Sequence, residues 1–592
     1  MQRACPGLLA ALLLSACTTV QPSAGATASP PAPGPSWSAA AFEHQTTDSA
    51  WHLAYATQSW AAEYSGHVIV VPARHNFIVD QEWIAADQES HLPPSAGKGP
   101  VLKHAWTTHG SSWDYDTDIK FVMFGPGFVK EHVRLGKTTL QNIAPTYAQL
   151  IGTERPPGSM GRVMKEALVG GTRRPKVILT IVMDGGGLNL YRAWPDAWPT
   201  IASLASRGVE YTEAKVTQLE TATAPSHAAI GTGGYPVRTH LLANEVYQPE
   251  TNDVVSSFDD LSSRLVAAPT LADVYGSRTG HRAVVIGASF SAVPALAMTG
   301  HGSSLDPGNK NQIVVFFAKP TKPTWKEQFP GTGDERRLMT NPDLFRFPTY
   351  LLGRKPEPYV RELTSGSGTW MGHQVTGELV PFTPAGVRFD CDNVLLMMEH
   401  EPIDSAETTA LIYVNFKGTD LSSHRWGFES LESREALVAQ DKCIGRLLQK
   451  LNQRVGEGQY VVTIASDHGM APLPELVNGH RLDLARLLEL INRRFGAEIS
   501  LGGGFVDLWF DQEKMKNRGI TNRDIAGFLR SLSAGDYYGA RDRWPAYLPY
   551  TPEVKVFFDV FTAEQISQYV KAGDGPQRPN PYTEPEPALG SQ

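Results

Sequence analysis

Three short apolar runs, each followed closely by an aspartate, most strongly constrain how this chain can fold. They are Val177–Met183 before Asp184, Leu411–Phe416 before Asp420, and Tyr460–Ala465 before Asp467. Strands of this kind, apolar at nearly every position, are typical of a mostly parallel sheet that is buried on both faces. Helical patterns lie between them, as at Pro199–Arg207 and Glu432–Val455. The sequence therefore predicts an α/β fold, a mostly parallel sheet with helices on both faces.

The length of 592 residues allows a large core with insertions. We assign the core to residues 171–480, and expect its Pro-, Gly- and Lys-containing stretch at about 302–400 to form an irregular cap. Residues 481–575 predict a small α+β appendage, with a helix at Leu482–Phe495, a strand at Phe505–Phe510 and a helix at Thr521–Ser531. The Pro-rich tail at 576–592 is expected to be disordered.

The N-terminal segment predicts a lipoprotein signal peptide over residues 1–17. Arg3 precedes an apolar run at residues 8–14, which is too short to span a bilayer. The run ends in Leu14-Ser15-Ala16-Cys17, which resembles a bacterial lipobox with Cys17 as the lipidated residue. An ordinary cleaved signal peptide is the alternative. Residues 18–50, rich in Ala, Ser, Thr and Pro, are expected to be a disordered tether. We therefore expect a location in the bacterial cell envelope, lipid-anchored and facing the periplasm or exterior.

Charge and cysteine content narrow the remaining classes. A formal net charge of −8 does not suit a nucleic-acid-binding protein, which usually has a basic face, so no nucleic acid partner is predicted. No Cys-x-x-Cys pair is present, so thiolate metal sites and redox motifs are not indicated. Cys391 and Cys443 are either a disulfide or two buried free thiols. The sequence carries no signal for an oligomeric state.

Polar residues that follow the strands predict a metal centre. Asp467 and His468 follow one strand, Asp420 and His424 are spaced i, i+4 after another, and Asp184 follows a third. Taken alone, Asp467 and His468 could be capping or surface residues, and Asp420 and His424 are equally compatible with a solvated turn. Side chains beyond the carboxyl ends of parallel strands converge, and three carboxylates would repel one another unless cations lie between them. Mixed oxygen and nitrogen ligands suit zinc or a similar divalent ion.

The segment from Glu220 to Pro236 carries a specific motif. It contains Thr223-Ala224-Pro225-Ser226-His227 at the start of an expected helix, then Thr232-Gly233-Gly234-Tyr235-Pro236. Further on, His240 and Asn244 fall within His240-Leu241-Leu242-Ala243-Asn244. This pattern resembles the nucleophile segment of the type I phosphodiesterase and nucleotide pyrophosphatase branch of the alkaline phosphatase superfamily. Asp420-x-x-x-His424-x-x-Gly427 and Ser466-Asp467-His468-Gly469 are similar to the two metal motifs of that branch.

The resemblance implies a metal-dependent hydrolase of phosphate esters. It makes Thr223 both the nucleophile and a metal ligand, Asn244 a ligand of a phosphoryl oxygen, and a covalent phosphothreonine the intermediate. Two divalent metals, with zinc favoured by ligand type, would be held by Asp184, Asp467 and His468 and by Asp420 and His424. A small-molecule phosphate ester is the implied substrate. We expect His227 and His240 to be structural rather than ligating.

One further histidine ligand, which the family places far downstream, is expected at His109 instead. Thr108-His109-Gly110 and the following Tyr115-Asp116-Thr117 resemble the family's late histidine segment, and residues 143–152 resemble its last helix. We therefore interpret residues 51–170 as a C-terminal-type segment of the catalytic domain, moved to the front by circular permutation. The alternative is that His480 or a water completes the site.

The substrate class depends on a missing basic pair. A monoesterase branch of the family carries Lys-x-Arg before Gly-His, whereas residues 283–301 here, which end in Thr299-Gly300-His301, contain no Lys or Arg. This favours a phosphodiester or pyrophosphate substrate, although Arg238 or Arg425 could supply a cation. Alternatives are a phosphomonoesterase, a sulfatase or phosphotransferase of the same superfamily, and, from another class, a non-catalytic binding lipoprotein.

Overall fold

The computed structural model describes residues 49–79, 89–94, 101–103, 105–329, 331 and 335–570. Cys17, the expected signal peptide, most of the expected tether and the Pro-rich tail lie outside these residues. Within the described part of the chain, no helix has both the length and the apolar character needed to cross a membrane.

A nine-stranded sheet forms the centre of the protein. In spatial order its strands are β13 (Arg337–Met339), β12 (Ile313–Ala318), β11 (Val285–Ser289), β16 (Ala410–Phe416), β7 (Val177–Met183), β17 (Tyr460–Ala465), β5 (Phe121–Phe124), β8 (Val209–Lys215) and β6 (Val133–Thr139). β7 lies between β16 and β17 and is parallel to both, whereas β5 is antiparallel to its two neighbours. The three strands predicted from their apolar runs are therefore adjacent.

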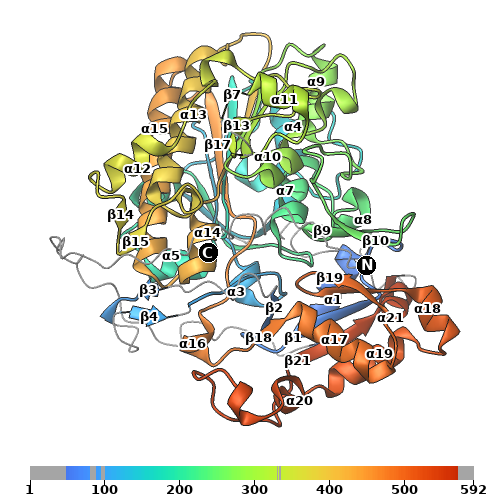
Figure 1. The fold of residues 1–592 in the computed structure, drawn as a ribbon. Helices are drawn as coiled ribbons and strands as arrows, with labels where there is room; N and C mark the ends of the chain where they lie inside the picture. The colour runs from blue at the N-terminus through green and yellow to red at the C-terminus, as the bar shows by residue number, and fades with distance from the viewer. Residues whose placement is uncertain are drawn as a thin grey trace, which may run out of the picture.

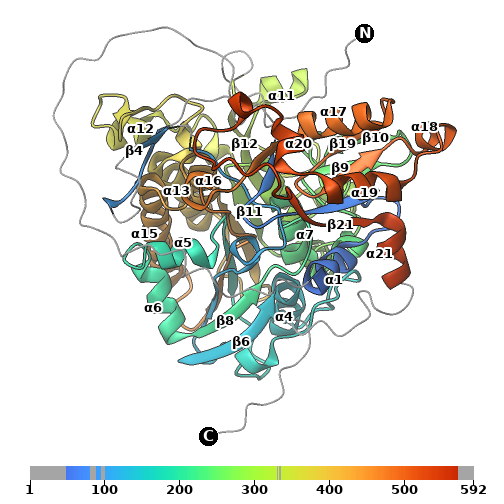
Figure 2. The ribbon, with the colours of Figure 1, turned by 90° about the horizontal axis from the view of Figure 1, so that it is seen from below.

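Helices cover both faces of this sheet. They are α4 (Ile143–Ile151), α5 (Leu188–Ala193), α6 (Pro199–Arg207), α7 (Thr223–Thr232), α9 (Leu271–Arg278), α10 (Ala292–Thr299), α13 (Pro384–His400), α14 (Gly418–Trp426) and α15 (Leu431–Arg454). In Figure 2, α5, α6, α13 and α15 lie on one side of strands β6 and β8, and α4 and α7 lie on the other. The predicted fold class, a mostly parallel sheet between two helical layers, is confirmed.

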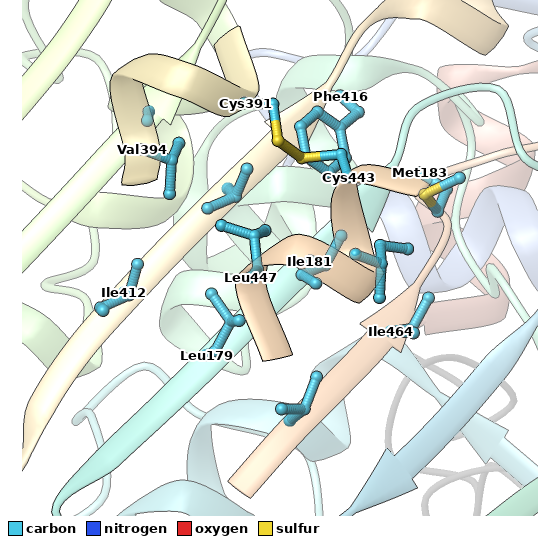
Figure 3. Close-up of a cluster of buried hydrophobic side chains, with 14 of the residues drawn as sticks. Leu179, Ile181, Met183, Cys391, Val394, Ile412, Phe416, Cys443, Leu447 and Ile464 are labelled. Carbon is cyan, nitrogen blue, oxygen red and sulfur yellow. A yellow bond between two sulfur atoms is a disulfide. The ribbon is translucent and has the colours of Figure 1, made fainter. Parts of the chain in front are cut away.

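The side chains of β7 alternate between two hydrophobic cores. Leu179 and Ile181 belong to the core that includes Leu447 of α15, whereas Ile178 and Val182 belong to the core on the other face. Figure 3 shows the first of these cores, with the β7 side chains directed at α15. This alternation is why the strand sequence is apolar at every position except Thr180, whose hydroxyl donates to that of Tyr147: neither face of the strand meets water.

The stretch at 302–400 is more regular than its Pro-, Gly- and Lys-containing sequence predicts. β12 and β13 extend the central sheet at one edge. α13 packs along α15, and a disulfide between Cys391 and Cys443 joins these two helices (Figure 3). Part of the expected cap is therefore an edge of the core, and the question left open for the two cysteines is answered by their pairing.

A second, four-stranded sheet combines the two ends of the described chain. Its order is β19 (Ser500–Gly503), β20 (Asp507–Phe510), β1 (Val68–Pro72) and β21 (Phe557–Thr562). In Figure 1 the blue strand β1 lies among the orange and red elements of the C-terminal region. β2 (Phe77–Val79) also pairs with a strand of the C-terminal region, β18 (Arg481–Asp483), but in parallel. The expected appendage is thus built from residues 481–570 together with strands that precede the core.

Shorter elements complete the described structure. Those beside the second sheet are α1 (Ser49–Ser59), α17 (Leu484–Phe495), α18 (Gln512–Asn517), α19 (Asn522–Ser531), α20 (Ala534–Tyr538) and α21 (Ala563–Tyr569). Around the core lie β3 (Glu89–His91), β4 (Val101–Lys103), α3 (Asp114–Thr117), α8 (Pro236–Thr239), β9 (Glu245–Gln248), β10 (Asp253–Ser256), α11 (Pro323–Gln328), α12 (Glu357–Leu363), β14 (Thr369–Trp370), β15 (His373–Gln374) and α16 (Pro474–Val477). α17 and α19 begin within two residues of their predicted positions.

Candidate active site

The three strand-end aspartates meet at one edge of the central sheet. Parallel pairing places Met183 opposite Phe416, and Val182 opposite Ala465, so β7, β16 and β17 end together. The Gly185 amide donates to Oδ1 of Asp467 at 3.1 Å. Gly185 itself has φ +65°, and a Cβ atom there would lie 2.7 Å from Cα of Asp420. Only glycine allows these loops to approach so closely.

The first candidate ligand group consists of Asp184, Asp467 and His468. One ligand atom from each lies within 4.8 Å of the others, and all three side chains are fully buried. Nε2 of His468 lies 3.5 Å from Oδ1 of Asp184 and 3.3 Å from Oδ2 of Asp467. These are the three residues that the sequence assigns to one metal.

The second candidate group consists of His109, Asp420 and His424. Nε2 of His109 lies 3.7 Å from Oδ1 of Asp420, and Nε2 of His424 lies 3.3 Å from the same oxygen. Asp420 and His424 share one face of α14 because they are spaced i, i+4. The rings of His109 and His468 stack with their centroids 3.5 Å apart, so the two groups are adjacent.

His480, the alternative to His109, lies elsewhere. Its backbone amide donates to Oδ1 of Asn76 at 2.9 Å, and its Nδ1 atom lies 3.3 Å from the hydroxyl of Tyr538. Asn76 lies in the loop between β1 and β2, and Tyr538 is the last residue of α20, so neither contact involves the candidate ligand groups. The structure brings His109, and not His480, to Asp420 and His424.

Backbone carbonyl groups orient all three histidines of the two groups. Nδ1 of His109 lies 2.8 Å from the oxygen of Thr221, Nδ1 of His424 lies 2.9 Å from that of Thr107, and Nδ1 of His468 lies 2.9 Å from that of Gly469. A carbonyl oxygen only accepts, so Nδ1 carries the proton in each ring. The lone pair is then on Nε2, which faces the carboxylates, as in metal-bound histidines.

Unpartnered buried atoms indicate that cations belong in these groups. Oδ1 of Asp420, Oδ2 of Asp467 and Nε2 of His468 are buried and have no hydrogen-bond partner among the described residues. A buried polar atom without a partner is costly, and coordination to a cation would satisfy all three. Burial lowers the pKa of His468 to about 3 and, with smaller effects from His468 and His424, holds the pKa of His109 well below its ordinary value. Neutral imidazole is the form that binds a metal.

Thr223 is the first residue of α7. The preceding Ala222 is extended, and the first intrahelical bond runs from the Ser226 amide to the Ala222 oxygen at 3.2 Å. Pro225 is tolerated because amides in the first turn have no intrahelical acceptor. The Thr223 side chain therefore lies at the positive end of a helix, where negative charge is stabilised. The residue is only 4% exposed.

Asn244 lies beside the same helix end. Its Oδ1 atom accepts a hydrogen bond from the Ala224 amide at 3.0 Å. This contact fixes the side-chain orientation next to Thr223 and leaves the side-chain amide nitrogen as its donor. The sequence-predicted phosphate ligand is thus placed within one residue of the predicted nucleophile.

His227 and His240 belong to neither of the two candidate ligand groups. Nδ1 of His227 lies 2.8 Å from the Thr223 oxygen, and its Nε2 atom lies 2.9 Å from Nδ2 of Asn415. That Asn415 nitrogen also donates to Oδ2 of Asp184 at 2.8 Å, so His227 and Asn415 hold Asp184 in place. His240 stacks on Tyr64 with ring centroids 4.5 Å apart.

Lys417 is the site residue that the sequence interpretation missed. Its Nζ atom donates to Oδ1 of Asp184 and to Oδ2 of Asp420, both at 2.8 Å, and to Oγ1 of Thr223 at 3.1 Å. Burial alone would lower the pKa of Lys417, but Asp184 and Asp420 raise it above its ordinary value. The only available signal was its position, three residues before Asp420 and directly after a strand.

The cations suggested as substitutes for Lys-x-Arg lie outside this cluster. Arg425 lies over the rings of Phe382 and Trp426, 5.6 and 5.8 Å from their centroids, and Arg238 is exposed. Within residues 283–301, which contain no Lys or Arg, the Ser289 hydroxyl donates to Oδ1 of Asn415 at 2.8 Å. The cation beside Thr223 therefore comes from the loop after β16.

Comparison with known sequences gives one family profile. The profile described as type I phosphodiesterase / nucleotide pyrophosphatase matches residues 178–523. The match begins in β7 and includes both strand-end motifs and the Thr223 helix. His109 precedes it.

Similar proteins include two phosphatases and one solved structure. Alkaline phosphatase PafA of Elizabethkingia meningoseptica is 20% identical over 405 residues, which cover 60% of this chain and 72% of that protein. Alkaline phosphatase PhoV of Synechococcus elongatus is 22% identical over 333 residues, which cover 51% of this chain and 60% of PhoV. The crystal structure of a PafA variant matches with a TM-score of 0.50 and 15% identity, over 66% of this chain and 85% of that one, a likeness of fold.

Proposed function

Because this chain belongs to the type I phosphodiesterase / nucleotide pyrophosphatase family and is a phosphoester hydrolase, we propose that Thr223 is its nucleophile and acts between two divalent metals. The observation that carries this proposal is the position of the Thr223 hydroxyl. Lys417 donates to Thr223 and also to one carboxylate of each candidate ligand group. The hydroxyl therefore lies at the junction of the two groups. Family membership also sets aside the non-catalytic alternative.

Asp184, Asp467 and His468 would hold one metal, and Asp420, His424 and His109 the other. When bound, the two cations neutralise the carboxylates, favour ionisation of the Thr223 hydroxyl and stabilise charge on the phosphoryl oxygens. Zinc suits this donor set. The unpartnered buried atoms of Asp420, Asp467 and His468 support the assignment.

The chain's own residues account for the two chemical steps. Oγ1 of Thr223 forms a bond to phosphorus as the bond to the leaving oxygen breaks, and that oxygen takes a proton from water. Water then attacks the phosphothreonine and gives up a proton to the hydroxide formed in the first step, and the bond between phosphorus and Oγ1 breaks, which returns Thr223 to its alkoxide. The helix N-terminus stabilises the Thr223 alkoxide before attack and after release. The Asn244 amide nitrogen donates to a phosphoryl oxygen and orients it.

Two observations bear on the substrate in opposite directions. The absence of Lys and Arg from residues 283–301 favours a monoanionic diester or pyrophosphate bond. Lys417 favours a monoester, because a third positive group beside Thr223 suits a dianion. We propose the diester as the first candidate substrate and the monoester as the second.

Hydrolysis of an aryl phosphodiester and of the matching monoester by the zinc-loaded full chain separates these candidates, with Thr223→Ala as the blank. Diester preference supports the first candidate. Monoester preference means that a cation in the site serves the extra charge, with Lys417 as the candidate, and the protein is then a phosphatase. Equal rates in the enzyme and the blank would contradict the role of Thr223.

We further propose that residues 51–170 are a permuted C-terminal segment. Two features support this: α1, at the start of the described chain, packs against α21, close to its end, and the loop at 169–173 is exposed. A chain opened in that loop, with residue 570 joined to residue 49 by a short linker, restores the common family order. It should fold and hydrolyse phosphoesters, and a chain that does not fold counts against the permutation.

The proposed location is the cell envelope, with a lipid on Cys17. The Cys391–Cys443 disulfide supports it, because disulfides persist in oxidising compartments. Cys17→Ser should release the protein from membranes into the soluble fraction. A membrane-bound variant would exclude Cys17 as the anchor.

A further inference from the structure

A third group of ligand-type side chains lies outside the active site. It consists of His91 at the end of β3, His373 in β15, and Glu432 in the first turn of α15. One ligand atom from each lies within 4.8 Å of the others. None of these residues belongs to the two groups beside Thr223, and the three come from distant parts of the sequence.

The group converges on one carboxylate oxygen. Oε1 of Glu432 lies 2.5 Å from Nδ1 of His91 and 2.9 Å from Nε2 of His373. The Glu432 side chain is fully buried, whereas those of His91 and His373 are 28% and 14% exposed. A buried, fixed carboxylate faced by two imidazoles at the surface leaves an open side for solvent or a further ligand.

Packing around the group holds the imidazoles in place. The His373 ring lies 4.8 Å from that of Trp426 and 6.2 Å from that of Trp370. The backbone of His91 donates to both carboxylate oxygens of Glu432, and the neighbouring Ser90 hydroxyl donates to the Trp426 oxygen at 2.6 Å. The His373 ring is thus held by aromatic contacts that do not involve Glu432, and the His91 backbone is fixed to the same carboxylate, which is the kind of preorganisation that a metal site requires.

We propose that His91, His373 and Glu432 bind a divalent first-row transition metal, such as zinc, at a third site separate from the active centre. Two imidazoles and one carboxylate are an established donor set for such ions when one or more positions stay open. Hard cations such as magnesium prefer all-oxygen ligands, so they are not the expected occupants. The competing arrangement is an ion pair in which a protonated imidazole neutralises Glu432.

A metal at this site would join three separate segments. It would tie β3 and β15 to the start of α15, which follows directly after α14 with Asp420 and His424. Trp426, at the end of α14, packs on His373. A metal at the third site would therefore stabilise the part of the core next to the second ligand group. Metal loading should raise the melting temperature of the protein.

Zinc stoichiometry of the full chain tests this proposal. The protein is stripped with a chelator, reloaded with zinc and dialysed, and bound zinc is counted by elemental mass spectrometry. His91→Ala and His373→Ala should each lose one equivalent relative to wild type, and the double variant should also lose only one, because the residues share one ion. His281→Ala is the matched control, since His281 faces a single carboxylate, Asp306, at 3.1 Å.

A zinc content equal to that of the wild type in both single variants overturns the proposal. A loss of two equivalents in the double variant also overturns it, because each histidine would then bind its own ion at the surface. A second measurement needs no variant: zinc should protect His91 and His373 from diethyl pyrocarbonate in the wild-type chain, and unchanged labelling contradicts a shared site. The readout is a difference from wild type, so it is independent of hydrolysis. If Thr223 proved not to be the nucleophile, the His91 and His373 variants would still be expected to lose one zinc equivalent.

Discussion

Nε2 of His109 lies 3.7 Å from Oδ1 of Asp420, although β5, β8 and most of the core separate the two residues in the chain. The His109 ring is held by the Thr221 oxygen and stacks on His468 of the neighbouring group. The contact with Asp420 and the stacking on His468 join the segment before the core to both candidate metal sites. It therefore carries the structural argument for how the active centre is completed.

His109→Ala should lower the zinc content of the full chain by one equivalent and sharply reduce hydrolysis. The reason is that Asp420 and His424 would lose their third protein ligand. His480→Ala is the control and should keep the wild-type content, because His480 contacts Asn76 and Tyr538. If His480→Ala lowered the zinc content and His109→Ala did not, His480 would be the ligand in place of His109.

Lys417→Met should lower kcat/KM for an aryl phosphomonoester by about 10- to 100-fold, which corresponds to the loss of a charge-assisted hydrogen bond of about 1.5–3 kcal/mol. The diester, with one negative charge fewer, should lose less. Lys417→Arg should restore part of the monoester activity. Arg425→Met is the control and should leave kcat/KM unchanged for both substrates. Equal losses of kcat/KM for both substrates would show that Lys417 positions the site residues and does not determine which ester is preferred.

Glu429→Gln should remove a pH-dependent part of the stability. Burial raises the pKa of Glu429 from 4.5 to about 8. The folded state then binds more protons than the unfolded state between these values, so the free energy of unfolding falls as pH rises through that window and levels off above it. The glutamine variant keeps the acceptor for the Leu473 amide, which lies 3.1 Å from Oε1 in the wild type. Denaturant unfolding at pH 5 and pH 8 measures the difference, and an identical pH slope in both proteins contradicts this account.

Replacing Cys391 and Cys443 together by Ala should lower the free energy of unfolding by about 2–4 kcal/mol, the usual effect of losing a disulfide. The bond links α13 to α15 across 52 residues. A reducing agent should lower the stability of the wild type to about that of the double variant and leave the variant unchanged. Equal unfolding midpoints in oxidised wild type and variant would show that the bond contributes nothing.

The sequence predicts the centre of this protein better than its edges. Asp184, Asp420 and Asp467 could be placed together because the carboxyl ends of parallel apolar strands converge. β12 was missed because Pro, Gly and Lys flank its short apolar run. The pairing of β1 with β20 and β21 was missed because strand partners far apart in the chain leave no local pattern.

The same distinction applies to individual site residues. His109 was found through a motif, since nothing in its local spacing points to Asp420. Lys417 follows a strand like many solvated lysines, and only the fold shows that its side chain turns inward. Glu432 gave no signal, because its partners His91 and His373 come from separate hairpins.

The most direct test of the central claim is to trap the covalent intermediate. The zinc-loaded full chain is mixed with excess aryl phosphate ester, quenched in acid within milliseconds, digested and examined by peptide mass spectrometry. Thr232→Ala is the control, because Thr232 lies in the same helix and has no proposed role in the chemistry. The account predicts a phosphoryl group, or its ester, on Thr223 in wild type and control, and none anywhere in Thr223→Ala. Turnover by Thr223→Ala at the wild-type rate, or a phosphoryl group on another residue, would contradict it.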